Sequence, residues 1–469
     1  MDAPAPEPVG AFPLRGGGAI ALHAGGIGHP RSVRFGGAVF TPWESVTHVT
    51  VGPGGLRLGS RHGSFLFRTA DFAENGAHRT LAAAIRERIA ALPDGAARLD
   101  RMAELDGLAR SRRRTPVTAS VTAACVAAFL LSVIAPAFHE AGLFSALLVR
   151  LGETWRIVTA NFLHATPGHL LLNGLGLAVL GGLVERTLGS RATAAVLTLA
   201  GLGAMAGCLL AGYPRALGAS GIVAGIAGAL LFLELRAPEF VPVGWRIPRR
   251  LFLALLAFES LFLLRLPHIA HAAHVGGFAA GMVGAAALRP GRRSPLTTRG
   301  GLAILSAASA AIVALAGFGW VRSVVAPDAE AIARRGEALL ALPDVPPGYL
   351  NDEAWRIAIS AEPSPGALDV ALRMAERAVR DTARSEPAVL DTLAELHFLR
   401  GDAELAIEIG HEAAALAPGQ PYYREQLRRF AGERAADDRP EAPPEDEVPP
   451  QPRRPGRPEP DEPGPGIRV

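Results

Sequence analysis

Seven long apolar segments constrain the fold of this chain more than any other feature. Each can cross a hydrocarbon core about 30 Å thick at about 1.5 Å per helical residue. The hydrophobic fraction of 49% and the mean hydropathy of +0.24 are also high for a soluble protein of 469 residues. We therefore predict membrane-spanning helices, which satisfy their own backbone polar groups. The expected segments are 117–138, 168–188, 192–212, 219–236, 249–266, 270–288 and 301–324.

The arginines predict the orientation of these segments. All 47 basic residues are arginine, and with 53 Gly and 38 Pro this is typical of a GC-rich genome. Arginine clusters at 110–114, 186–191, 246–250 and 289–299 fall on one side of the membrane. By the positive-inside rule the N-terminus is cytoplasmic, and seven crossings place the C-terminus outside. We expect an integral protein of a prokaryotic plasma (inner) membrane, inserted through internal segments because the N-terminus lacks signal-peptide features.

Two polar regions flank the membrane domain, which we expect over 117–325. Residues 13–98 alternate short β-like runs with Gly-rich turns and end in a helical pattern, so they resemble the topology of a pleckstrin-homology module. Residues 326–432 are predicted to be helical, and 387–418 resembles one tetratricopeptide repeat. Such helix pairs favour a small docking platform for a protein partner. The remaining parts are a disordered start (1–12), a basic linker (99–116) and a disordered Pro/Glu/Arg-rich tail (433–469).

Four polar side chains occur at one depth of the predicted membrane domain. His169 and Asn173 lie four residues apart at the start of the second segment, on one helix face. Ser220 opens the fourth segment, and His274 lies about one turn into the sixth. All three segments enter the membrane from the outer side. Polar groups inside hydrocarbon cost free energy, so function is the default hypothesis for a group of them.

These residue types favour covalent catalysis by a serine. A serine hydroxyl is a weak nucleophile until a base takes its proton, and imidazole has a suitable pKa. Ser220 and His274 fit these two roles, and their helices can approach closely at small residues. The glycines in question are Gly221, Gly225, Gly277 and Gly281. His169, the Asn173 amide and the Ser220 backbone N–H can donate to a developing oxyanion.

Other chemistries are excluded or disfavoured. No aspartate occurs between Asp106 and Asp328, so a membrane-embedded Ser-His-Asp triad or aspartate pair cannot form. The His-Glu-x-x-His motif is absent, and the two cysteines lie in apolar runs, so we expect no metal and no cofactor. The roles of His271 and Glu259 stay open. The net charge of +3 without a basic stripe argues against binding to nucleic acid.

The order of four motifs resembles the rhomboid family of intramembrane serine proteases, over about residues 151–288. The motifs are Trp155-Arg156, His169-xxx-Asn173, Gly218-Ala219-Ser220-Gly221 and Ala273-His274-xx-Gly277-xxx-Gly281. A seventh helix fits the family variant with one helix after a six-helix core. The resemblance thus implies a multi-pass α-helical membrane protein with a rhomboid-like fold.

The resemblance also implies roles for individual residues. Ser220 would be the nucleophile, His274 the general base, and His169, Asn173 and the Ser220 amide the oxyanion site. Trp155 and Arg156 would belong to an outer loop, and Glu185 would brace neighbouring helices. Gly218, Gly221, Gly225, Gly277 and Gly281 would support the site. The implied substrates are single-pass transmembrane proteins in the lipid bilayer, cleaved near the outer face.

Two other functions compete with proteolysis. A catalytically idle rhomboid-like scaffold would bind transmembrane clients without cleaving them, but such relatives typically lack the serine or the histidine. A transporter would show internal repeats and polar groups at the membrane midplane, and neither is apparent. The physiological substrate and the oligomeric state stay open.

Overall fold

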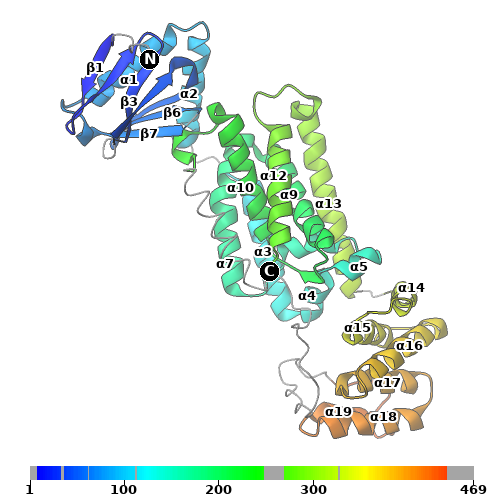
Figure 1. Cartoon of the computed structure of the whole chain (residues 1–469). Helices are drawn as coiled ribbons and strands as arrows, with labels where there is room; N and C mark the ends of the chain where they lie inside the picture. The colour runs from blue at the N-terminus through cyan, green and yellow to red at the C-terminus, as the bar shows by residue number, and fades with distance from the viewer. Residues whose placement is uncertain are drawn as a thin grey trace. The chain divides into compact units, whose positions relative to one another are not determined.

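The computed structural model describes residues 8–32, 36–61, 63–110, 114–247, 269–325 and 328–440. Within these ranges the chain forms two compact units (Figure 1). One unit holds the N-terminal domain and the apolar helices as far as Gly317. The other holds residues 150–153 and the C-terminal helices from Phe318 onward.

The described part of the N-terminal domain contains a four-stranded and a three-stranded antiparallel sheet, each with its strands in chain order. Helices α1 (Ala77–Ala90) and α2 (Gly95–Arg110) come after the strands. The strands are β1 (Gly10–Pro13), β2 (Ala19–His23), β3 (Gly26–Ser32), β4 (Gly36–Pro42), β5 (Val46–Gly52), β6 (Gly55–Ser60) and β7 (Gly63–Arg68). This confirms the predicted β-rich N-terminal region.

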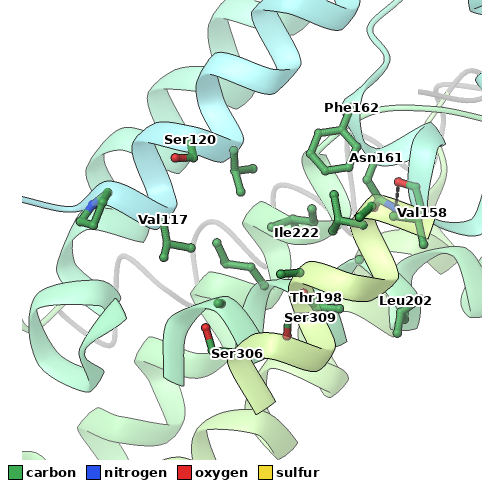
Figure 2. A pocket seen from close by; sticks show the side chains of 18 residues that line it. Val117, Ser120, Val158, Asn161, Phe162, Thr198, Leu202, Ile222, Ser306 and Ser309 are labelled. Carbon is green, nitrogen blue, oxygen red and sulfur yellow. Dashed lines mark hydrogen bonds between the residues drawn. The ribbon is translucent and has the colours of Figure 1, made fainter. Parts of the chain in front are cut away.

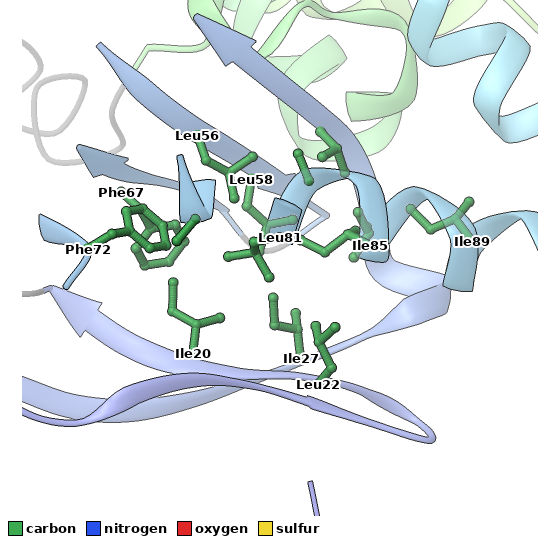
Figure 3. Close-up of a cluster of buried hydrophobic side chains, with 14 of the residues drawn as sticks. Ile20, Leu22, Ile27, Leu56, Leu58, Phe67, Phe72, Leu81, Ile85 and Ile89 are labelled. Carbon is green, nitrogen blue, oxygen red and sulfur yellow. The ribbon is translucent and has the colours of Figure 1, made fainter. Parts of the chain in front are cut away.

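The core of this domain lies between the two sheets and α1. Leu81, Ile85 and Ile89 recur every four residues, so they share one face of α1, and all three are fully buried. Figure 3 shows Leu81 between Ile20 of one sheet and Leu58 of the other. Alternating apolar residues on the strands thus meet the apolar stripe of a closing helix.

The expected basic linker over 99–116 instead begins as part of a packed helix. Met102 and Leu105, one turn apart on α2, are buried although charged residues surround them in the sequence. Arg98 of the same helix donates to the backbone carbonyls of Trp43 and Val46, at 2.6 Å each. Because many residues of this stretch are charged, the sequence pattern did not indicate its narrow apolar face. This face packs α2 against the domain.

The apolar helices coincide with the predicted segments. They are α3 (Pro116–Ile134), α7 (Pro167–Gly176) continued by the π-helical turn η4 (Leu177–Gly181) and α8 (Gly182–Leu188), α9 (Ser190–Leu210), α10 (Ser220–Arg236), α12 (His271–Leu288) and α13 (Arg299–Val325). Four of the described helical stretches are long and apolar enough to cross a membrane: 116–134, 167–188, 190–210 and 299–325. The predicted segment 249–266 lies outside the described residues. The chain is a multi-pass helical membrane protein.

Helices α9, α10 and α12 pack through small residues. A Cβ added at Gly281 would lie 2.7 Å from Gly225 Cα, and one at Gly277 would lie 2.8 Å from the carbonyl carbon of Gly221. In both cases the neighbouring carbonyl oxygen is closer still. On its other side, Gly221 faces the methyl group of Ala204 in α9. The backbones of α10 and α12 therefore touch, as small-xxx-small motifs allow.

The C-terminal unit consists of helices in succession. They are α14 (Ala329–Leu340), α15 (Pro347–Ala358), α16 (Pro365–Asp381), α17 (Pro387–Leu399), α18 (Ala403–Leu416) and α19 (Pro421–Phe430). The expected repeat over 387–418 coincides with the α17–α18 pair, and its tetratricopeptide character stays a prediction. The expected disordered tail starts at 433, but the structure describes it to Pro440, and Arg439 donates to the buried Glu395 at 2.7 Å.

Arg246 joins the N-terminal domain to the segment after α10. Its guanidinium donates to Ser60 O at 2.9 Å, to Thr47 Oγ1 at 2.8 Å and to His48 Nδ1 at 3.0 Å. Because a guanidinium can only donate, His48 Nδ1 must be the acceptor and therefore unprotonated. Burial, reinforced by the positive charge of Arg246, lowers the pKa of His48 to about 3. The junction requires a neutral imidazole.

Acid should weaken this junction. At pH values between the ordinary histidine pKa of 6.5 and the folded-state pKa of about 3, unfolded chains bind a proton at His48 that folded chains do not. The free energy of unfolding therefore falls as the pH falls through this range. We expect a loss of about 2 kcal/mol at about pH 5. Thermal unfolding of the full chain in detergent at neutral pH and at this lower pH, with limited proteolysis of the N-terminal domain, measures it. His48→Asn keeps an acceptor near Nδ1 and should remove this part of the pH dependence; an unchanged dependence would contradict the assignment.

Gly281→Ala should destabilise the membrane domain by at least about 2 kcal/mol, because neither backbone at this crossing can move without separating the helices. Thermal unfolding in detergent provides the measurement. Gly317→Ala is the matched control, since a Cβ added there has nothing within 4 Å. If both variants unfolded alike, the proposed tight crossing of α10 and α12 would be wrong.

Candidate active site

Ser220 and His274 are hydrogen-bonded to each other. The distance from His274 Nε2 to Ser220 Oγ is 2.9 Å, although 54 residues separate them in the sequence. Ser220 is the first residue of α10, and His274 lies in the first turn of α12. Both side chains are half-buried. An imidazole in hydrogen-bond contact with a hydroxyl is the geometry in which a base can activate a serine nucleophile.

Gly218 allows His169 and Asn173 to approach the start of α10. Its φ of +117° disfavours any residue with a side chain. A Cβ at this position would also lie 2.6 Å from His169 Cε1 and 2.8 Å from its Nε2, and 3.8 Å from Asn173 Nδ2. The backbone N–H of Gly218 donates to Ala160 O at 2.9 Å, which fixes the loop. The structure thus brings all four predicted polar residues around the loop 218–220.

Several buried polar atoms at this site have no hydrogen-bond partner among the described residues. His169 Nδ1 and Asn173 Nδ2 have no hydrogen-bond partner among the residues that the structure describes. The same holds for Nε2 of His164, whose ring centroid lies 4.9 Å from that of His169. The sequence patterns predicted no role for His164. Its position five residues before His169 is the feature that could have indicated one. Buried polar groups normally find partners, so the Asn173 amide nitrogen, which can only donate, is suited to a ligand that supplies a carbonyl oxygen.

The remaining histidine of this region is His271, on the same helix as His274. The two ring centroids are 6.4 Å apart, and His271 Nε2 is buried without a hydrogen-bond partner in the described part of the chain. In those same residues, no three His, Cys, Asp or Glu side chains come together in a way that could hold a metal ion.

Trp155 and Arg156 hold the loop before α7 in shape. Trp155 Nε1 donates to Ala141 O at 3.1 Å, at the end of α4 (Pro136–Gly142). The buried Arg156 guanidinium donates to the carbonyls of Glu140 and Leu143, at 2.6 Å each. The short strand β8 (Phe144–Ser145) then pairs with β9 (Arg215–Ala216), next to Gly218. The two residues therefore fix the loop that adjoins the serine.

Glu185 binds the first turn of α3. Its buried carboxylate accepts from the backbone N–H of Val117 at 3.1 Å and of Thr118 at 2.9 Å. It also accepts from the hydroxyls of Thr118 and Ser190, at 2.7 Å each. First-turn amides have no partner within their own helix, so the carboxylate provides the acceptors that they need. Its negative charge also interacts favourably with the positive end of the helix dipole. The acid thus ties α3, α8 and α9 together.

Comparison with known proteins matches this region to a family model. The family model described as a rhomboid domain covers residues 151–291. Residues 151–291 are a rhomboid domain. The match includes every predicted polar residue of the site, and it excludes the N-terminal domain, α3, α4, α13 and the C-terminal helices.

Similar proteins carry rhomboid names. The chain is 34% identical over 144 residues to "Rhomboid protease GluP" of Bacillus subtilis, which is 30% of this chain and 27% of that protein. It is 31% identical over 160 residues to "RHOMBOID-like protein 5" of Arabidopsis thaliana, covering 32% of this chain and 50% of that protein. The matches therefore span a quarter to a half of these relatives. They support an intramembrane protease or a related rhomboid-like function.

Replacing Glu185 by glutamine should destabilise the protein by about 2 to 3 kcal/mol, because the amide nitrogen would face donors and leave at least one of them buried without an acceptor. Unfolding in detergent would measure this loss. Glu87→Gln on the exposed face of α1 is the control and should have little effect. Equal stability of both variants would contradict a bracing role for Glu185.

Proposed function

We propose that this protein is an intramembrane serine endopeptidase, with Ser220 as nucleophile and His274 as general base. One observation carries the proposal: the 2.9 Å hydrogen bond between Ser220 Oγ and His274 Nε2 inside a rhomboid domain. The name of one relative, "Rhomboid protease GluP", supports the same chemistry. We propose a pair and not a Ser-His-Asp triad, since the sequence has no aspartate between Asp106 and Asp328.

The first half of the reaction forms an acyl-enzyme. As Ser220 Oγ attacks the carbonyl carbon of the scissile peptide bond, its proton moves to His274 Nε2. The carbonyl oxygen becomes an oxyanion, which accepts from His169, from the Asn173 amide and from the Ser220 backbone N–H. The C–N bond then breaks, and the imidazolium gives its proton to the leaving amine. In the second half, His274 deprotonates a water molecule that attacks the ester, and the proton returns to Ser220 Oγ.

The donors around loop 218–220 support this assignment. The Asn173 amide and the His169 ring both approach Gly218, two residues before the nucleophile. Neither Asn173 Nδ2 nor His169 Nδ1 has another partner among the described residues. Donors that are placed before the reaction need no reorganisation when negative charge develops, and each is commonly worth about 3 to 4 kcal/mol of transition-state stabilisation.

The substrates proposed are single-pass membrane proteins. In the orientation predicted by the arginines, the N-terminal domain is cytoplasmic, the C-terminal helices are extracytoplasmic, and Ser220 lies near the outer face of the plasma membrane. Cleavage would then occur where a substrate helix leaves the hydrocarbon core and its peptide bonds become accessible. The C-terminal helices would serve as a docking platform for a protein partner.

Reconstituted liposomes with a fluorogenic transmembrane substrate test the proposal. Ser220→Ala and His274→Ala should each lower the cleavage rate at least about 1,000-fold, since nucleophile and base act as one unit. Ser132→Ala is the matched control: in the described part of the chain the hydroxyl of this α3 serine donates to the carbonyl of Ala128, at 2.8 Å, and its loss should leave the rate unchanged. A wild-type protein that neither cleaves nor reacts with a fluorophosphonate probe would instead favour the client-binding scaffold.

A further inference from the structure

An arginine from the last described segment of the chain is bound by two helices of the C-terminal unit. The Arg439 guanidinium donates through Nη2 to Glu395 Oε1 at 2.7 Å and to Ala358 O at 3.4 Å. Its Cζ atom lies 5.5 Å from the centre of the Trp355 ring. Helix α17 thus supplies a carboxylate, and α15 supplies an aromatic ring and a carbonyl oxygen. Carboxylates and aromatic faces are groups that bind a guanidinium well, and we call this set the arginine site.

The Glu395 carboxylate needs a second cation besides the one that the helices provide. It is fully buried, and its other oxygen, Oε2, pairs with Arg429. Arg429 is an integral part of the fold, since its side chain is only 1% exposed and lies over the rings of Phe398 and Phe430. The oxygen Oε1 instead pairs with Arg439, which comes after the last helix. A buried carboxylate oxygen without a donor costs free energy, so the arginine site requires an occupant.

Arg439 is an incompletely bound occupant. Its side chain is 29% exposed, and its Nε atom is buried without a hydrogen-bond partner among the described residues. The segment that carries it, 431–440, forms no helix or strand, and most of its residues are exposed. Its anchors include a hydrogen bond from Arg429 to Ala436 O at 2.6 Å and surface ion pairs, which contribute little. A guanidinium that satisfies all its donors at the arginine site can therefore replace that of Arg439.

We propose that the arginine site binds an arginine side chain from an extended segment of a partner protein, and that Arg439 occupies the site while no partner is bound. Charge complementarity carries the proposal, because the fully buried Glu395 accepts a guanidinium from outside the helices. Lysine does not fit as well, since an ammonium group lacks the planar face that stacks on Trp355. The inference rests on the docking platform of the proposed function and gives it a defined ligand chemistry.

Peptide binding to the full chain in detergent tests the site. The probe is a fluorescent peptide with the sequence of residues 435–440, and a matched probe carries citrulline, an uncharged isostere, in place of arginine. Arg439→Ala empties the site, so it should bind the arginine probe at least about tenfold more tightly than the wild type does. The same variant should bind the citrulline probe at least about tenfold more weakly than the arginine probe. Fluorescence anisotropy measures the affinities, and equal affinity for the two probes would overturn the proposal.

Asp437→Ala is the matched control variant. Asp437 is an exposed residue of the same segment, and its replacement leaves Arg439 in place, so this variant should bind the arginine probe as the wild type does. If Arg439→Ala does not fold, the two probes are compared on the wild type at higher concentration, where the arginine probe should still bind more tightly. A purely structural role for Arg439 predicts that Arg439→Ala unfolds at a lower temperature and binds neither probe, which would contradict the proposal.

The later arginines of the tail are the alternative occupants. They are Arg453, Arg454 and Arg457. If Arg439→Ala bound the arginine probe only after these three were also replaced by alanine, the tail itself would fill the site, and a partner would be ruled out as its occupant. None of these measurements involves cleavage. Their failure would therefore overturn the arginine site and leave the roles of Ser220 and His274 to the liposome experiment.

Discussion

The backbone contact between α10 and α12 is the constraint on which the rest of the structure depends. Ser220 and His274 reach hydrogen-bond distance only because Gly277 and Gly281 let the two helices touch at Gly221 and Gly225. The donor–acceptor distance of a hydrogen bond can change by only a few tenths of an ångström before the bond weakens. A single Cβ at this crossing would displace the helices by more than that, so the chemistry of the pair rests on the absence of side chains one and two turns away.

Two buried charged side chains fix the segments around this contact, because they form hydrogen bonds with backbone groups of those segments. Glu185 accepts from the first turn of α3, and Arg156 donates to one carbonyl in the last turn of α4 and to another just after that helix. In an apolar interior such a charge is tolerated only when it is fully hydrogen-bonded. Removing either side chain would leave unpaired backbone groups in an apolar environment. The two residues therefore determine the conformation of segments that contribute nothing to the reaction directly.

Local patterns in the sequence predicted the helices of the membrane domain and the residues of the candidate site. Apolar length predicted the helices, and the entry side of each helix predicted that His169, Asn173, Ser220 and His274 share one depth. Long-range polar contacts have no periodicity and could not be predicted in this way. Arg246 contacts Thr47 and Ser60, which are almost 200 positions away in the sequence. No sequence pattern predicts either contact. The packed face of α2 was missed because two apolar residues were outweighed by their charged neighbours.

Small residues allow close backbone contact at one helix interface and leave unfilled space at another. Between α10 and α12, glycine faces backbone, so nothing remains to be filled. Where α3 and α13 line a cavity (Figure 2), they do so mostly with serine, alanine and valine, whose short side chains leave the space between the helices unfilled. Native interiors rarely leave such volume empty, and in a bilayer the available filler is lipid. Helix α13, which lies outside the rhomboid match, therefore contributes one wall of a cavity of about 520 Å³.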